Sequence, residues 1–280
     1  MCAEAAIFYM DWMEELMDFG LSQPLLLALF GFVILPLLCM GAERLWPQYP
    51  DARRFRSGFV SDLVWYAVQS VVSRSIAPWV VFVAVLPVFI IADLPLDNYW
   101  AGFGPVAQWP FWLQVLVVFV VADFLSYWQH RLFHQPGFWP VHAVHHSSEN
   151  LDWLSATRFH PFNEIGAQLV YVAPLIALGF SPTAFVVLAP FTATYAVVLH
   201  ANVNLSFGPL QYCLASPVFH RWHHSQAVEA QDKNFAGFLP VWDVLFGTFY
   251  HPRGRLPQQF GVKDPVGEGF WRQLTYPWRA

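Results

Sequence analysis

Long stretches of this chain are almost free of charge, and this feature restricts its fold more than any other. Each of four stretches carries at most two charged side chains: residues 21–41, 59–92, 109–129 and 165–200. A helix that crosses a bilayer needs about 20 mostly apolar residues. Only 12% of the 280 residues are charged, whereas an average soluble domain is about 25% charged. The sequence therefore predicts a membrane protein and argues against a disordered chain, a nucleic-acid-binding protein and an ordinary cytosolic enzyme.

Two of the four stretches are too long for a single straight span. Residues 59–92 are interrupted by Pro78, which predicts either a kinked helix or a span followed by a re-entrant segment. Residues 165–200 are broken by Gly179 and Pro182, a pattern typical of a helical hairpin. We therefore expect an all-α, integral-membrane bundle of about 4–5 transmembrane helices. A large soluble core is the alternative.

The charges between the stretches predict the orientation of the bundle. Residues 1–20 contain five acidic side chains and no basic one, whereas four arginines lie within residues 42–58. By the positive-inside rule, residues 42–58 are expected in the cytoplasm. Alternate crossings by the following stretches then bring His130 and His200 to the cytoplasmic face. An acidic start also differs from the basic start of a cleavable signal peptide, so we expect none.

Histidine is concentrated in one part of the chain. None of the 11 histidines lies in residues 1–129, and ten lie in residues 130–224, where a background of about 2% would give about two. Eight of them form three blocks: His130-x3-His134, His142-x2-His145-His146 and His220-x2-His223-His224. Side chains at i and i+3 or i+4 share one face of a helix, so each block can present its imidazoles together.

Eight clustered imidazoles are difficult to accommodate without a metal ion. They repel one another when protonated and lack hydrogen-bond partners when neutral. Eight ligands also exceed the coordination of a single tetrahedral or octahedral ion, so the blocks predict two metal ions. Imidazole binds iron, zinc, copper and nickel alike, which leaves the metal open. The zinc-hydrolase motif H-E-x-x-H is not formed at His130, because Arg131 follows it.

One carboxylate lies in the third apolar stretch. Helical spacing places Asp123 and Tyr127 on the same face as His130 and His134. An acid within a membrane span costs roughly 2.5–3.5 kcal/mol on insertion scales. A hydrogen bond from a ligating imidazole to Asp123 would offset this cost. The alternative is an aspartate in the bundle interior, bonded to Tyr127 or to the backbone.

The histidine blocks occur together with two further motifs. Asp123–His134 reads DFLSYWQHRLFH, and Trp242–Thr248 reads WDVLFGT. Over roughly residues 110–250, this combination resembles the fatty acid hydroxylase/sterol desaturase superfamily of integral-membrane, non-haem di-iron oxygenases. The resemblance implies two iron ions in a helical cap at the cytosolic side, with O2 as co-substrate. It implies these nine metal ligands: His130, His134, His142, His145, His146, His200, His220, His223 and His224.

The resemblance also bears on residues outside this ligand set. Some members carry a further histidine at the position of Asn204, so Asn204 is expected to be a weak ligand or to bind water beside the site. His160 is expected beside the ligands or at the substrate entrance, with core packing as the alternative. Asp243 is expected to orient an imidazole or to cap its own turn. His251 is expected to be structural.

By this resemblance the protein is expected to be an oxidoreductase that hydroxylates or desaturates a C–H bond of a membrane lipid, such as a sterol, a fatty acyl chain, an ether lipid or a carotenoid. The sequence has no G-x-G-x-x-G after a strand, no C-x2-C pattern and no haem-attachment motif. An external donor, a ferredoxin or a cytochrome with its reductase, is therefore expected. A histidine-rich metal transporter and a zinc-dependent lipid hydrolase are the alternative functions.

We expect three regions within one structural domain. Residues 1–108 form an N-terminal transmembrane region, residues 109–251 form the oxygenase core with spans and a cytosolic cap, and residues 252–280 form a tail. The three cysteines, at positions 2, 39 and 213, are too few and too widely spaced for a disulfide framework or a thiolate metal site.

Overall fold

The described part of the chain consists of helices and loops, as the apolar stretches predict. This computed structural model describes residues 30–53 and 55–280, which contain no strand and only two isolated β-bridges, Pro47–Val203 and Ser225–Phe260. The chain divides into two compact units, Met1–Leu45 and Trp46–Ala280. The first unit contains the π-helix η2 (Phe30–Ile34) and helix α3 (Leu35–Leu45). The acidic residues 1–20 and the first part of the predicted 21–41 span lie outside the described residues.

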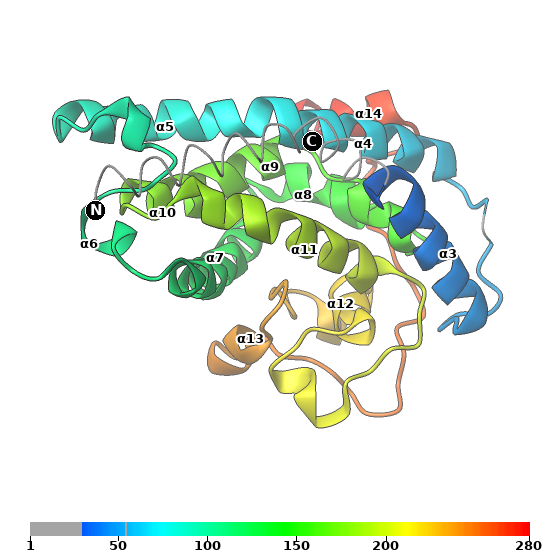
Figure 1. Ribbon diagram of the computed structural model, residues 1–280. Coiled ribbons are helices and arrows are strands. Elements are labelled where there is room, and N and C mark those ends of the chain that lie inside the picture. The colour runs from blue at the N-terminus through cyan, green and yellow to red at the C-terminus, as the bar shows by residue number, and fades with distance from the viewer. Residues whose placement is uncertain (1–29, 54) are drawn as a thin grey trace. The chain divides into compact units, whose positions relative to one another are not determined.

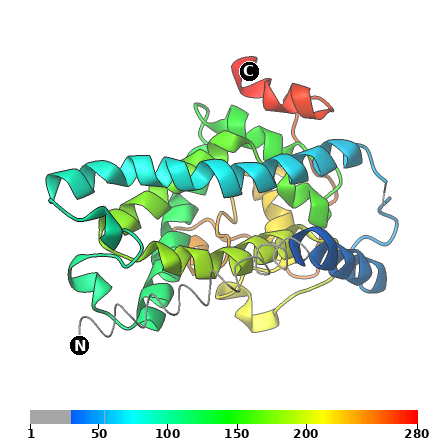
Figure 2. The same cartoon turned by 45° about the horizontal axis from the view of Figure 1, so that its top comes forward.

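The second apolar stretch forms one continuous helical run. It consists of α4 (Phe59–Val71), the π-helix η3 (Val72–Ile76) and α5 (Ala77–Ile91). Figures 1 and 2 show these three elements as a single rod. The π-helix lies directly before Pro78, whose ring cannot donate a backbone N–H and disturbs the preceding turn. Of the two predicted arrangements, the helical run agrees with a single helix with a local irregularity rather than with a span followed by a re-entrant segment.

Two described helices are long and apolar enough to cross a membrane. They are α7 (Phe111–Phe133), with 23 residues, and α11 (Pro182–His200), with 19 residues. Helix α5 is also apolar but has only 15 residues. The all-helical architecture with candidate membrane-spanning helices is therefore as predicted, whereas the count of four to five spans stays a prediction.

The predicted break within residues 165–200 is confirmed. The segment before the break comprises α9 (Pro161–Ala167), the π-helix η6 (Gln168–Val172) and α10 (Ala173–Ala177). In the turn, Gly179 has φ = +100°, and a Cβ atom there would lie 2.2 Å from the carbonyl oxygen of Phe103. Only glycine fits such a position without strain. The hydroxyl of Ser181 then caps the N-terminus of α11.

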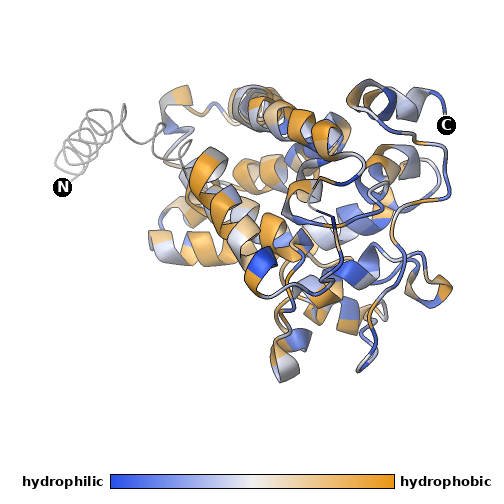
Figure 3. Cartoon of the chain, turned by 90° about the vertical axis from the view of Figure 1, so that its right-hand side faces the viewer, coloured by the Kyte–Doolittle hydropathy of each residue, from blue (hydrophilic) through white to orange (hydrophobic). Residues whose placement is uncertain are grey.

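The long helices of the second unit pack on one another and keep apolar faces exposed. Phe89 of α5 packs in one cluster with Ile176 of α10, and Val118 of α7 packs in another with Ala184 of α11. Elsewhere on α5, Ile91 is 85% exposed. Figure 3 shows hydrophobic residues over much of the helical ribbon. Exposed apolar faces of this kind fit a lipid environment.

Two short helices carry the H-x2-H-H blocks. Helix α8 (Trp139–His146) contains one block, and α12 (Pro217–His223) with its C-cap residue His224 contains the other; each helix has a proline in its first turn. The other short elements are η4 (Leu96–Asn98), α6 (Gly104–Ala107), η5 (Trp153–Thr157), η7 (Gly208–Tyr212), η8 (Val228–Ala230), α13 (Val241–Leu245), α14 (Phe270–Leu274) and η9 (Tyr276–Trp278).

Candidate metal centre

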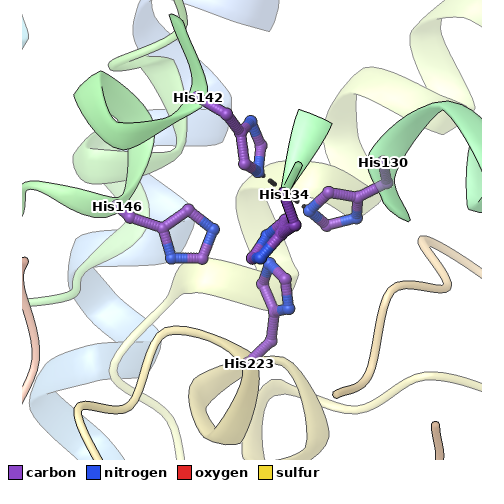
Figure 4. A group of neighbouring side chains, drawn as sticks. All are labelled: His130, His134, His142, His146 and His223. Atoms are coloured by element: carbon purple, nitrogen blue, oxygen red, sulfur yellow. Dashed lines mark hydrogen bonds between the residues drawn. The ribbon is translucent and has the colours of Figure 1, made fainter. Parts of the chain in front are cut away.

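The structure brings the nine predicted histidine ligands into two adjacent groups. Within each group, one nitrogen atom of every imidazole lies within 4.8 Å of the others. The five-histidine group, drawn in Figure 4, contains His130, His134, His142, His146 and His223. The four-histidine group contains His145, His200, His220 and His224. The predicted division of one histidine-rich region into two potential metal sites is therefore present in the geometry.

Each H-x2-H-H block serves both groups. On α8, His142 and His146 are four residues apart and point to the five-histidine group, whereas His145 points to the other group. On α12 and its C-terminal cap, His223 faces the five-histidine group, while the two remaining imidazoles of that block face the other group. Adjacent positions on a helix point about 100° apart, so a single turn can supply two neighbouring sites. The C-terminal ends of α7 and α11 add His130 and His200.

Six of the nine imidazoles are oriented through Nδ1 by an oxygen acceptor. The pairs are His130 with Phe235 O (2.7 Å), His134 with Asp232 Oδ1 (3.2 Å), His142 with Asn163 Oδ1 (3.1 Å), His145 with Arg158 O (3.1 Å), His200 with Ala196 O (2.7 Å) and His223 with Lys233 O (2.8 Å). These oxygens cannot donate a hydrogen bond, so Nδ1 carries the proton in each case. Histidines that ligate metals commonly have their second nitrogen fixed in this way.

The remaining nitrogens fit a bound cation. In a neutral imidazole with a protonated Nδ1, Nε2 has only a lone pair. The Nε2 atoms of His130 and His142 nevertheless lie 2.9 Å apart, and those of His145 and His200 lie 3.2 Å apart. Two facing lone pairs repel unless a cation lies between or beside them. In addition, three buried Nε2 atoms have no hydrogen-bond partner within residues 30–53 and 55–280: those of His134, His146 and His223.

Burial keeps these imidazoles in the form that binds metals. Desolvation is the largest cause that holds their pKa values well below the usual 6.5, and neighbouring imidazoles lower them further. This holds for six histidines outside the long apolar helices: His142, His145, His146, His220, His223 and His224. A neutral imidazole is the ligating form, so the groups are ready to bind cations at neutral pH.

The two acids predicted near the site accept hydrogen bonds from backbone N–H groups. Asp123 accepts the backbone N–H groups of Phe238 and Leu239, each at 3.1 Å, and the indole N–H of Trp242 at 2.9 Å. Its hydrogen bonds in the described structure therefore include none to an imidazole, and the backbone-bonded alternative for Asp123 matches the geometry. Asp243 likewise accepts backbone N–H groups in the segment before α13.

Tyr127 is completely buried beside this segment. Its hydroxyl lies 2.9 Å from the hydroxyl of Thr248, which donates to Asp243 at 2.6 Å. Arg131 also donates to the Tyr127 hydroxyl at 3.3 Å. Tyr127 therefore joins the hydrogen-bond network of Asp243, and its ring packs against Phe235, with ring centroids 6.0 Å apart.

The other predicted residues lie outside both groups. His160 caps α9 by accepting the N–H of Phe162, and its Nε2 bonds the carbonyl of Leu274 at 3.0 Å, which agrees with the packing alternative. Asn204 is exposed beyond the end of α11. His251 belongs to neither group.

Sequence reasoning missed the two side chains that orient ligands, Asn163 and Asp232. Asn163 is 2% exposed and also donates its amide to the carbonyl of Val141. Neither residue belongs to a histidine block. Both are polar residues, and a polar residue in a sequence does not by itself reveal its hydrogen-bond partner.

The comparisons with known proteins match the part of the chain that contains the nine histidines. Residues 115–248 match the family model described as fatty acid hydroxylase. The ornithine lipid hydroxylase OlsE of Rhizobium tropici is 33% identical over 156 residues, which cover 55% of this chain and 47% of that protein. The alkylglycerol monooxygenase of Homo sapiens is 34% identical over 145 residues, which cover 51% of this chain and 32% of that protein.

A third relative is named for a different activity. The very-long-chain aldehyde decarbonylase GL1-5 of Oryza sativa subsp. indica is 30% identical over 138 residues, which cover 45% of this chain and 22% of that protein. This chain thus spans less than half the length of each of these three relatives. No solved structure matches the chain.

Proposed function

Because this chain carries a fatty acid hydroxylase domain and belongs to the fatty acid hydroxylase/sterol desaturase superfamily, we propose that it is a di-iron oxygenase that uses O2 to oxidise a membrane lipid. The observation that carries the proposal is the set of buried Nε2 lone pairs, which face one another while their Nδ1 atoms are held by oxygen acceptors. Nine nitrogen ligands in two groups would hold two iron ions. When bound, the irons would supply the redox chemistry needed to oxidise a C–H bond with O2.

The protein's own residues would fix the position of the site relative to the lipid. Helices α7 and α11 are the two candidate spans, and each delivers a ligand from its C-terminal end, His130 and His200. We place both ends at the cytoplasmic face of the membrane. A lipid tail that lies along the apolar faces of these helices would then reach the ligands without leaving the bilayer.

The substrate we propose is an amphiphilic membrane lipid with a long alkyl or acyl chain. The relatives named above include an ornithine lipid hydroxylase and an alkylglycerol monooxygenase, and hydroxylation is accordingly the reaction we favour. Each turnover needs two electrons from outside the chain, so we propose a ferredoxin, or a cytochrome with its reductase, as the partner.

Incorporation of isotopically labelled O2 into lipid tests the proposal. The purified protein is loaded with iron, placed in lipid nanodiscs, and supplied with a ferredoxin and its reductase. We expect labelled hydroxylated lipid by mass spectrometry only when both O2 and reductant are present. The variants H142A and H145A, one from each group, should lose this product, whereas H251A, which alters a histidine outside both groups, should retain it.

Three results would contradict the proposal. Lipid cleavage that proceeds without O2 and reductant would indicate a hydrolase, and metal uptake into sealed vesicles without lipid oxidation would indicate a transporter. Full activity in H142A and H145A would show that neither histidine group takes part.

A further inference from the structure

One short segment, Asp232–Ala236, orients three of the five ligands in the five-histidine group. The carboxylate of Asp232 accepts from His134, and the carbonyl oxygen of Lys233 accepts from His223 at 2.8 Å. The carbonyl oxygen of Phe235 accepts from His130 at 2.7 Å. The geometry of this metal site therefore depends on the backbone course of five consecutive residues.

Asn234 holds the middle of this segment in a strained conformation. It has φ = +60° and is completely buried. Its amide group donates to the carbonyls of Phe219 at 2.9 Å and Tyr250 at 2.7 Å, and its oxygen accepts the N–H of Tyr250 at 2.7 Å. Its own backbone N–H bonds the carbonyl of Thr248 at 2.9 Å. All hydrogen-bonding groups of the side chain are thus used to fix the backbone.

Asp243 holds the end of the same segment. Its carboxylate is completely buried and accepts the N–H groups of Phe235 at 2.8 Å and Ala236 at 2.9 Å. The hydroxyl of Thr248 donates to it as well, at 2.6 Å. Hydrogen bonds to a charged group contribute more than neutral ones. Asp243 therefore fixes the N–H of Phe235, the same residue whose carbonyl oxygen accepts from His130.

The four-histidine group relies on other segments. The acceptor for His145 is the carbonyl of Arg158, in the loop that follows η5, and the acceptor for His200 is the carbonyl of Ala196 within α11. Neither carbonyl lies in Asp232–Ala236. The oxygens that orient His145 and His200 are therefore separate in the chain from those that orient the five-histidine group.

From this arrangement we infer that Asp243 is a positioning residue for the five-histidine metal site alone, and that Asn234 positions the same site while also bonding α12 beside His220 of the four-histidine group. They act through Asp232–Ala236, and neither binds the metal. The inference needs one part of the proposed function, namely that both histidine groups bind metal. Loss of a partner that orients a ligating histidine typically lowers metal affinity about 10–100-fold, so this is the size of effect we expect at one site and not at the other.

Zinc binding by the whole protein in detergent tests the inference. The metal-free protein is titrated with Zn²⁺ in competition with a chromophoric chelator, in two backgrounds. H145A/H220A removes two ligands of the four-histidine group, and H142A/H223A removes two of the five-histidine group. D243N replaces one acceptor oxygen of Asp243 by an NH2 group, which cannot accept the hydrogen bond of the backbone N–H that it faces. N234D keeps the acceptor for Tyr250 but loses both amide donations.

We expect N234D to weaken zinc binding about 10–100-fold in the H145A/H220A background and less in the H142A/H223A background, because Asn234 also bonds the carbonyl of Phe219 beside His220. We expect D243N to weaken zinc binding about 10–100-fold in the H145A/H220A background and to leave it unchanged in the H142A/H223A background. The unchanged site also shows that the variant is folded. D123N is the matched control, because Asp123 is a buried carboxylate that accepts two consecutive backbone N–H groups from residues without contacts to a ligand. It should weaken neither site selectively.

Equal weakening of both sites, or no weakening of the five-histidine site, would overturn the inference. These results are distinguishable from failure of the proposed function. Wild-type protein that binds two zinc ions but oxidises no lipid refutes the oxygenase and leaves the inference intact. An active oxygenase whose D243N variant binds zinc normally refutes the inference alone.

Discussion

Replacing Asp62 with asparagine is expected to destabilise the protein strongly. Asp62 is completely buried in α4 and forms ion pairs with two buried arginines, Arg56 at 2.7 Å and Arg158 at 2.6 Å. Arg56 has a second partner, because it also contacts Asp152 at 2.6 Å. Asparagine keeps the shape of the side chain and removes its charge, so the Arg158 guanidinium would lose its only ion-pair partner among the residues that the structure describes.

The magnitude follows from the burial of this cluster. Breaking a buried ion pair by neutralising one partner costs about 3–5 kcal/mol, because an uncompensated charge stays buried. Arg158 retains a hydrogen bond to the hydroxyl of Ser147, and asparagine still offers an acceptor oxygen, so we expect the lower end, about 3 kcal/mol. At about 2–4 °C per kcal/mol for chains of this size, the Tm should fall by about 6–12 °C.

Thermal unfolding of D62N in detergent measures this change. E229Q is the matched control, since Glu229 pairs with Arg255 at 3.5 Å on the surface, where both side chains are more than half exposed. Such a pair contributes at most about 1 kcal/mol, so E229Q should shift the Tm little. A Tm for D62N within the range of E229Q would refute the reasoning that the buried charges depend on one another.

Two further predictions concern the hairpin turn and the histidine groups. G179A should lower the Tm by about 2–8 °C, because a positive φ costs about 1–2 kcal/mol and the new Cβ would overlap the carbonyl oxygen of Phe103. G137A, with no atom within 4 Å of the added Cβ, should change the Tm little, and equal shifts would contradict this account. The metal-free protein should lose stability as the pH falls below about 6.5, the unfolded value of histidine. The folded pKa values of six buried imidazoles are lowered, so only the unfolded chain gains these protons, and stability is fully present above that pH. Thermal unfolding with a chelator across pH 5 to 8 measures this slope, and a Tm independent of pH would exclude it.

The membership of the histidine groups could largely be predicted from spacing, because helical geometry is local. Residues at i, i+3 and i+4 lie on neighbouring faces, and α8 and α12 follow this rule. His200 was expected only from the family resemblance, since no histidine lies near it in the sequence. Helix α11 brings it to His145 and His220, with Nε2 distances of 3.2 and 3.0 Å.

Asn204 shows where local spacing stops being informative. Position 204 would follow His200 on the same face if α11 continued. The helix instead ends at His200, and Ala201 is extended with ψ = 142°. The chain then turns, and the backbone N–H of Asn204 bonds the carbonyl of Trp46 at 2.9 Å. Asn204 is therefore exposed and lies outside both groups.

The partners that orient the ligands could not be predicted, because four of the six are backbone carbonyls and two are polar side chains outside the histidine blocks. Asp123 was expected to accept from an imidazole, but its backbone partners lie more than 110 residues away. The carbonyl of Phe235 is 105 residues from His130. Every residue has a carbonyl, so nothing in the sequence marks the few that contact a ligand.

The metal content of the purified protein tests the central claim most directly. Elemental analysis after anaerobic loading with iron should find about two ions per chain in the wild type, and about one in H142A/H223A and in H145A/H220A. Two ions in the wild type and one in each variant would support two independent sites built from the two groups. A single ion in the wild type, or a content unchanged by either pair of substitutions, would contradict the account.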